Sequence, residues 1–449
     1  MPYDGEYAHH TSLQRIAQSE RVRTLLGMVR TRPTEPEATP LHSVGAPLAT
    51  SERPKLIVAI DGSYTEAPAR TGYPGATVGY LAIASVVIKL AELDALDEDR
   101  PIDPVAFRTT HETASIEEAL PGANIVFASG GSARESFRRA LYEALLHKQL
   151  DEDDPTSLLD TYHVMLALRP ADTSDQACPY VERDCTNRLR IGPGVSTCPQ
   201  CEGAIYSTDA LRIHESFRDE ASNLEALGEV SQVWERLLLV DLLRALERRG
   251  LLDVIDDMAF FVDGPLAVFG HPAWISQTIR AELMRLAAAL RGSGHRELLL
   301  LGIEKSGTFV NHFDTIDQSE DPGEQRFPLR SLQLLTDAYI KERVVFSQSH
   351  KPYGKDTYFG RKFFYKSARG SRIVATVPFQ TTEQADLDRD DLGRYPRLGD
   401  ACALLDLLAS ARYPNAVSAI VAAHAEAAIP LHLGSKVLEQ LTRALVRAS

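Results

Sequence analysis

Two Asp-Gly pairs, each at the end of an apolar run, are the residues of this chain best placed to do chemistry. Asp61-Gly62 follows the run LIVAI at 56–60, and Asp263-Gly264 follows MAFFV at 258–262. Such runs bounded by Gly or Pro are typical of buried strands, which would hold each carboxylate rigidly near the surface. Two carboxylates brought together could hold a divalent metal ion. Asp-Gly is also the commonest two-residue hairpin turn, so plain turns remain an open interpretation.

Four of the five cysteines lie close together in the sequence: Cys178, Cys185, Cys198 and Cys201. The second pair has the C-x2-C spacing that lets two thiolates bind one tetrahedral zinc ion, whereas the first pair is more widely spaced. We predict a structural zinc site, closed to substrate, that helps an insertion too short for its own core to fold. An iron–sulfur cluster, a redox pair and incidental thiols remain alternatives. Cys402, among apolar neighbours, is expected in the core.

One segment of this acidic chain is locally basic and rich in aromatic residues. The chain has 48 basic and 62 acidic residues and a net charge of −14, which argues against a protein coated for nonspecific nucleic-acid binding. Two interpretations of the basic segment stay open: a surface that neutralises phosphates and stacks bases, or a hairpin whose rings belong to the core. Lys305, after an apolar run, is a further candidate phosphate contact. The basic residues of the segment are Lys351, Lys355, Arg361, Lys362, Lys366, Arg369 and Arg372.

Composition and pattern place the chain among large soluble α/β proteins. Its 449 residues, 44% of them apolar, can bury a large core. We find neither an apolar run long enough to span a membrane nor the features of a signal peptide, and we expect a cytoplasmic protein. We predict an N-terminal helix and proline-rich linker (1–54), a first core part (55–149), a cysteine-bearing insertion (150–215) and a second core part (216–449).

The expected elements combine into a mixed sheet with helices on both faces. The first Asp-Gly is expected at the wide tip of a hairpin, because a second apolar run at 76–88 follows it. A helix at 133–147 begins after Ser132, where an ordinary N-cap competes with a phosphate site. Further strands are predicted at 124–128 and 297–303, and further helices at 11–30, 220–249 and 272–290. Residues 326–347 are predicted to be helical with a short strand at the end, followed by a hairpin at 357–379 and two helices at 398–449.

The order of these pieces resembles the NurA family, DNA-end-processing nucleases with an RNase H-like core. The resemblance covers roughly residues 55 to 445 apart from the insertion. It is carried by the strand with Asp61-Gly-Ser, a Glu-bearing helix before Asp263-Gly-Pro-Leu, the strand end Gly302-Ile-Glu-Lys305, the aromatic hairpin that ends at Pro378, and a closing Tyr-Pro...Ala-His.

The resemblance implies roles for particular residues. The metal-binding acids of the family fall on Asp61 and Asp263, and two Mn or Mg ions held by them and a helix carboxylate would hydrolyse a phosphodiester. For that third carboxylate we favour Glu235, in Val-Trp-Glu-Arg-Leu-Leu, over Asp241 and Glu247. The Tyr and His of the family fall on Tyr413 and His424, although His424 by itself would be an ordinary helix histidine.

The resemblance also implies partners. The family works with HerA, a hexameric DNA-translocating ATPase, and as a nuclease dimer, and this chain has no Walker motif of its own. Double-strand break repair and antiphage defence would use the same residues. A catalytically inert scaffold that binds DNA or docks on HerA is the main alternative to a nuclease, and a zinc-ribbon adaptor without an enzyme core is disfavoured.

Overall fold

The computed structural model describes residues 11–29, 50, 53–70, 75–94, 111–150, 154–170, 175–180, 184–318, 326–409, 417–429 and 433–448. The chain forms two units, residues 1–42 and 43–449. The first contains α1 (Thr11–Gln18) and α2 (Glu20–Met28), where one helix was predicted. Ser19 separates them because its backbone is extended and its hydroxyl caps α2 by accepting from Val22 N. Most of the predicted linker lies outside the described residues.

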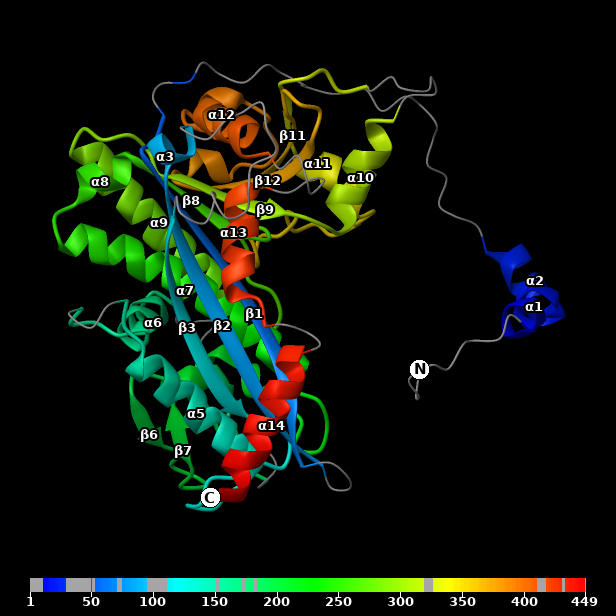
Figure 1. Ribbon diagram of the computed structural model, residues 1–449, viewed down its shortest axis with the longest axis vertical. Coiled ribbons are helices and arrows are strands. Elements are labelled where there is room, and N and C mark those ends of the chain that lie inside the picture. The colour runs from blue at the N-terminus through cyan, green and yellow to red at the C-terminus, as the bar shows by residue number, and fades with distance from the viewer. Residues whose placement is uncertain are drawn as a thin grey trace. The chain divides into compact units, whose positions relative to one another are not determined.

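The second unit is built on an eight-stranded mixed sheet of order β10-β11-β12-β9-β8-β1-β2-β3 (Figure 1). The adjacent strands β1, β8 and β9 are parallel, and the other neighbouring pairs are antiparallel. The strands are β1 (Leu56–Arg70), β2 (Ala76–Lys89), β3 (His111–Pro121), β8 (Met258–Asp263), β9 (Leu299–Glu304), β10 (Ser331–Leu334), β11 (Gly360–Lys366) and β12 (Arg372–Pro378).

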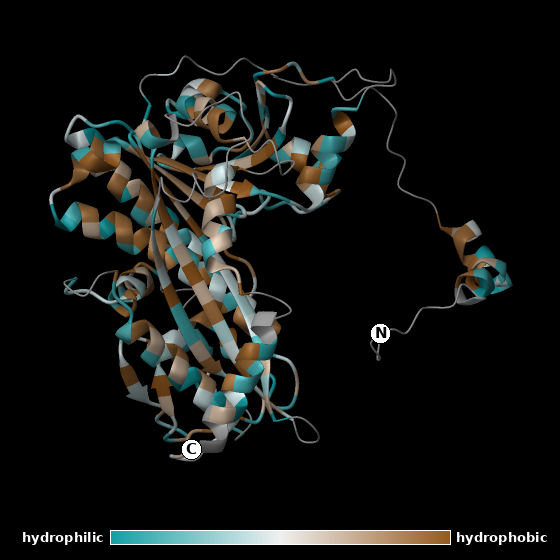
Figure 2. Ribbon diagram, viewed as in Figure 1, coloured by the Kyte–Doolittle hydropathy of each residue, from teal (hydrophilic) through white to brown (hydrophobic). Residues whose placement is uncertain are grey.

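Helices cover both faces of this sheet, which confirms the predicted mixed α/β fold. Alternate residues of β1 point to opposite faces. Val58 and Ile60 pack with α5 (Ala133–His147), α6 (Leu158–Ala167), α7 (Leu224–Arg248) and α9 (Ile275–Gly292). Ile57 and Ala59 pack with α12 (Leu398–Leu408) and α13 (Ser418–Ala427). Apolar bands along the strands are visible in Figure 2.

Further helices and a helical turn belong to the second unit. They are α3 (Leu90–Asp94), α8 (Leu252–Asp256), α10 (Thr308–Ile316), α11 (Asp337–Tyr339), a π-helical turn (Ile340–Val344) and α14 (Leu433–Ala448). No described helix combines the length and the apolar character that a membrane crossing needs.

The first Asp-Gly pair is not a hairpin tip, so that prediction is wrong. β1 continues through Asp61-Gly62 to Arg70, and Asp61 lies opposite Ala84 of β2. The long antiparallel ladder with β2 keeps the pair extended, because both strands carry apolar residues well beyond this point.

Several other local predictions need correction. Residues 124–128 form no strand: β3 already occupies the edge beside β2, and Asn124 adopts a left-handed backbone with φ 56°. Within 326–347 the strand β10 comes first and helical turns follow it, the reverse of the predicted order, and the described parts of 398–448 hold three helices rather than two. The helix at 133–147 is confirmed with its N-cap, since Ser132 Oγ accepts from Glu135 N at 3.1 Å.

The predicted insertion at 150–215 contains two kinds of structure. Its first part includes α6, which packs against α5, α7 and α9 in the main core. Its second part consists of two small ribbons, β4 (Asp175–Ala177) with β5 (Arg188–Arg190) and β6 (Val195–Thr197) with β7 (Ala204–Tyr206). These ribbons carry the four clustered cysteines.

Candidate active site and cysteine cluster

The register of three parallel strands brings two acids and a lysine to one edge of the sheet. β1 and β8 pair up to Ile60 and Val262, so Asp61 and Asp263 are the next residue on each strand. β9 lies on the other side of β8 and ends one residue before Lys305. Because the carboxyl ends of parallel strands lie at the same edge, the three side chains meet there.

Lys305 lies between the two aspartates. Its Nζ is 2.9 Å from Asp263 Oδ1 and 3.6 Å from Asp61 Oδ2. Asp61 is only 2% exposed, and its Oδ1 accepts from the amide of Gly62 at 2.7 Å. The lysine therefore partly neutralises a buried aspartate and its neighbour.

His424 reaches the same site from α13. Its Nδ1 lies 3.0 Å from Asp61 Oδ2, and its side chain is 57% exposed. Ser63, two residues after Asp61, fixes the end of α13: its hydroxyl donates to Ala427 O and accepts from Ile429 N at 3.2 Å. The Asp-Gly-Ser sequence thus both presents a carboxylate and holds the helix that carries the histidine.

Glu235 of α7 joins the two aspartates in the lining of one pocket of about 550 Å³. Its carboxylate forms an ion pair with Arg236 and accepts from Ser231 Oγ at 3.3 Å. Gly62 permits this approach, because a Cβ there would lie 2.6 Å from Glu235 Oε1. Arg236 also donates to Asp263 O at 2.8 Å, which ties α7 to the end of β8.

The two other candidates for the third carboxylate lie elsewhere. Asp241 is buried and accepts from Thr161 Oγ1 of α6 at 2.7 Å. Glu247 forms an ion pair with Arg285 of α9. Neither contributes to the pocket lined by Asp61 and Asp263, so the geometry favours Glu235.

The pocket has an excess of buried negative charge. Burial raises the pKa of Asp61, and Asp263 raises it further, while Lys305 and His424 act in the opposite direction. Burial also raises the pKa of Glu235 to about 7, against the effect of its partner Arg236. A cation in the pocket would stabilise the charged forms of both groups.

The residues present fit a hard divalent metal ion. Carboxylate oxygens are the ligands that Mn²⁺ and Mg²⁺ prefer. Asp263 Oδ1 is shielded from solvent and accepts no well-aligned hydrogen bond from the described residues, although Lys305 lies beside it. Within the described part of the chain, only the cysteines form a group of three or more ligand atoms all within 4.8 Å. The carboxylates of the pocket are therefore more widely spaced than the sulfurs of the cysteine cluster.

The predicted basic surface divides into a buried and an exposed part. Arg361, Lys362 and Lys366 are at most 3% exposed. Lys362 pairs with Glu304 and Lys366 with Asp317, while Arg361 donates to a backbone carbonyl. A prediction of phosphate contacts on an exposed surface does not fit these three, because their side chains are buried. Exposed side chains are found at Lys351, Lys355 and Arg369, and the rings of Phe363, Phe364 and Tyr365 lie in the core.

Several further residues of the site were not singled out from the sequence, among them Gly228 and Ser231 of α7. Gly228 lines the pocket, and Ser231 both lines it and donates to Glu235. With Glu235 they share one side of α7, and their spacing of three and four residues along the sequence was the available signal. Tyr413, predicted beside His424, lies outside the described residues.

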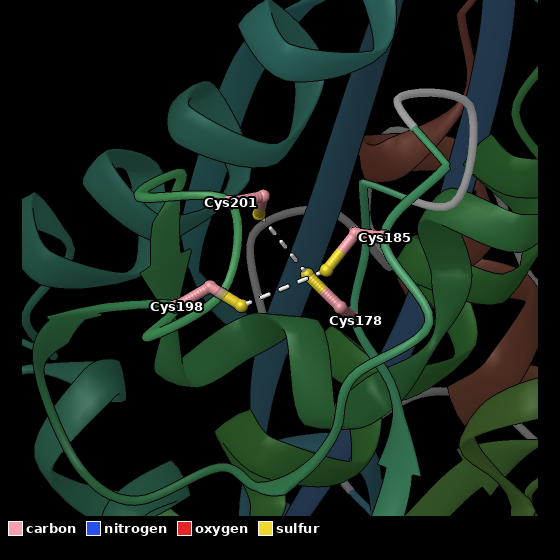
Figure 3. A group of neighbouring side chains, drawn as sticks. All are labelled: Cys178, Cys185, Cys198 and Cys201. Atoms are coloured by element: carbon pink, nitrogen blue, oxygen red, sulfur yellow. Dashed lines mark hydrogen bonds between the residues drawn. The ribbon is translucent and has the colours of Figure 1, made fainter.

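The four cysteines form a compact cluster (Figure 3). Their sulfur atoms all lie within 4.8 Å of one another, with Cys178 and Cys201 at 3.8 Å and Cys185 and Cys198 at 3.8 Å. These distances are too long for disulfides, and all four are free thiols. Each sequence pair lies at the tip of one ribbon, so the cluster joins the two ribbons as a zinc ion would.

The electrostatics of the cluster favour a thiolate at Cys198. The Cys198 sulfur accepts hydrogen bonds from the backbone amides of Cys201 and Gln200 and from the Asn187 side chain. Together they lower the pKa of the Cys198 thiol to about 6. Burial raises the pKa of Cys178 instead. A zinc ion would keep all four sulfurs deprotonated.

Arg138 of α5 ties the cysteine ribbons to the main core. It is 2% exposed, and it donates to Asp209 Oδ1 at 2.7 Å and to Ala204 O of β7 at 2.8 Å. Its guanidinium also lies 4.7 Å from the ring centre of Tyr180, between the first two cysteines. Order in the cysteine cluster is therefore coupled to packing of α5.

The comparison with family models agrees with the resemblance seen in the sequence. The crystal structure of the NurA nuclease from Sulfolobus solfataricus is similar, with 12% identity over 99% of both chains and a TM-score of 0.34. No curated protein matched the chain. The family model for the NurA domain matches residues 55–429, most of the sequence. The chain therefore belongs to the NurA family.

Proposed function

We propose that this protein is a metal-dependent nuclease that hydrolyses DNA phosphodiester bonds in the pocket of Asp61, Glu235 and Asp263. One observation carries the proposal: Asp61 of β1, Glu235 of α7 and Asp263 of β8 line one pocket beside Lys305 and His424. Membership of the NurA family, whose members process DNA ends, supports the same conclusion.

The three carboxylates would hold the divalent ion, Mn²⁺ or Mg²⁺, and the family resemblance suggests two ions. When bound, such ions activate water and stabilise the charge that develops on a phosphate. Lys305 would bind a nonbridging phosphate oxygen, since its ammonium already lies at the edge of the pocket. His424 holds Asp61 through Nδ1, and its exposed ring can exchange a proton with the substrate. Tyr413 would orient the scissile phosphate.

The partners proposed for this nuclease follow from the family. A HerA-type hexameric ATPase would supply the DNA, and the nuclease would act as a homodimer in the cytoplasm. We propose end processing during double-strand break repair, with antiphage defence as an alternative use of the same chemistry. An inert scaffold that binds DNA or HerA is the competing class of function.

A nuclease assay tests the proposal. End-labelled linear DNA is incubated with Mn²⁺, Mg²⁺ or EDTA, with and without the ATPase, and wild type is compared with Asp263→Ala. Asp253→Ala is the matched control, because it removes an exposed carboxylate on α8, outside the pocket. We expect metal-dependent digestion by wild type and Asp253→Ala only. Equal digestion by all three proteins would exclude catalysis at this site.

A further inference from the structure

We propose that a second cavity, next to the carboxylate pocket, is a subsite for one unpaired base of the DNA strand being cleaved. The inference rests on the proposed nuclease function and adds the substrate class, a single-stranded segment beside the scissile bond. The cavity has a volume of about 240 Å³ and is lined in part by Tyr353 and Tyr358. This volume is below the roughly 300 Å³ of pockets that hold whole drug-sized ligands, so it suits a group no larger than a single base.

A row of aromatic rings connects the two cavities. Phe269 lines the carboxylate pocket and is 40% exposed. Its ring meets the edge of Tyr358 at 5.6 Å. Tyr358 lines the second cavity together with Tyr353, and their ring centres are 5.6 Å apart. A strand leaving the carboxylate pocket would therefore meet a ring surface on which bases can stack.

The backbone holds these rings in place relative to Asp263. Val268 N donates to Thr357 O at 3.0 Å and Phe359 N donates to Leu266 O at 2.9 Å, so the segment after β8 pairs with the segment before β11. Phe269 N donates to Gln232 Oε1 at 2.7 Å, and Gln232 lies on α7 near Glu235. The ring row and the carboxylates thus share the same supports, which limits the entropy lost when a strand binds.

The second cavity also offers polar groups that suit a base. Lys362 lines it, is 3% exposed and pairs with Glu304, the residue before Lys305. Its Nζ lies 4.9 Å from the ring centre of Tyr358. An ammonium group has three N–H donors, and Glu304 accepts one of them. A carbonyl of an entering base can accept another, with its ring against Tyr353 or Tyr358.

Exposed charge lies where the sugar-phosphate backbone would run. Lys351 and Lys355 are exposed on the segment that carries Tyr353 and Tyr358. Lys355 also lines the cavity, as does Arg280 of α9. Phosphate contacts would hold the strand while a base enters the cavity. A base within a duplex is stacked and paired, so it cannot enter without being extruded.

Binding in buffer without added Mn²⁺ or Mg²⁺ tests this subsite separately from catalysis and leaves the cysteine cluster its zinc. The probes are a fluorescent oligothymidylate of about 12 nucleotides, the matching duplex, and an abasic strand of equal length. Phe269→Ala removes the connecting ring, and Tyr353→Ala removes a wall of the cavity. Tyr353→Phe retains the ring, and Lys351→Ala is the phosphate-contact control.

We expect Phe269→Ala and Tyr353→Ala each to weaken oligothymidylate binding about tenfold, the loss of one base stack. Binding of the duplex and of the abasic strand should change less than about twofold, and Tyr353→Phe should bind like wild type. Lys351→Ala should weaken all three probes alike. The zinc content and melting temperature of each variant check its folding. Unchanged oligothymidylate binding in Phe269→Ala, or equal losses on all probes in both alanine variants, would overturn the proposal even if the protein cleaves DNA.

Discussion

The cysteine cluster and the carboxylate pocket differ in nearly every physical respect. The cluster draws four soft ligands from a short stretch of chain and brings all sulfurs within 4.8 Å. The pocket draws hard oxygen ligands from β1, α7 and β8. Its volume is about 550 Å³, and a lysine and a histidine contact its aspartates.

This difference separates a site built for folding from one suited to chemistry. A tetrahedral ion with four sulfur ligands has no open position, so the cluster can cross-link the ribbons but cannot bind substrate. The pocket retains buried charge, an available Asp263 oxygen and room for a phosphate. A change to the ligands of one region should therefore leave the other region unchanged.

The largest effect is expected at the carboxylate pocket. Asp263→Ala should lower metal-dependent DNA cleavage about a thousandfold, because loss of a metal ligand removes several kcal/mol of transition-state stabilisation. Initial rates on end-labelled DNA measure this. The zinc content should stay at the wild-type value, and a variant that lost zinc as well would contradict the separation of the two regions.

The next largest effect is expected at the cysteine cluster. Cys185→Ser should release the zinc and lower the melting temperature by about 10 °C, because metal binding contributes to folding. Zinc analysis and calorimetry measure the two changes. Cys402→Ala is the control, since Cys402 is a buried cysteine among apolar residues outside the cluster. If both variants kept their zinc, the cluster would not be the zinc site.

A tenfold effect of pH is expected on metal binding to the pocket. Glu235 has a pKa raised to about 7, so in the metal-free protein it holds a proton that a bound cation must displace. Affinity for Mn²⁺ should therefore rise about tenfold from pH 6 to pH 8. Titrations with Mn²⁺ followed by electron paramagnetic resonance measure this affinity without any cleavage of DNA.

Two variants identify the titrating group. Glu235→Gln should bind Mn²⁺ weakly with less dependence on pH, while His424→Gln should retain the rise if Glu235 is responsible. The fold favours the proton on Glu235, so this group's contribution to the stability of the metal-free protein should decrease as pH rises from about 4.5 to 7. A pH dependence that survives in Glu235→Gln would show that another group titrates.

The smallest effect is expected on the exposed basic segment. Lys355→Ala should weaken DNA binding about threefold and lower the salt dependence by about one unit of slope, without affecting stability.

Lys362→Met should instead destabilise the protein by about 3–5 kcal/mol, because it leaves Glu304 buried without its partner. DNA binding measured over a range of salt concentrations, together with denaturant unfolding, distinguishes the two variants. If Lys362→Met kept its stability and lowered the salt dependence of DNA binding as Lys355→Ala does, Lys362 would be a phosphate contact rather than a buried ion-pair partner.

Much of the fold could be predicted because its signals are local. The helix at 133–147 agrees with the structure at both ends, since Ser132 and Glu135 form a capping box. The hairpin of β11 and β12 was also predicted. β3 was missed, because its polar sequence occupies a sheet edge, where few side chains need to be apolar.

The cysteine cluster was determined by the sequence itself, because its ligands are close along the chain and short turns can bring them together. The carboxylate pocket was only suggested by it. Tertiary structure decided that Asp61 lies within β1, that register places it beside Asp263, and that Gly62 admits Glu235. It also buried Lys362 while leaving Lys355 exposed. Charge and residue type are properties of the sequence, but burial and distance between remote residues arise only when strands pair and helices pack.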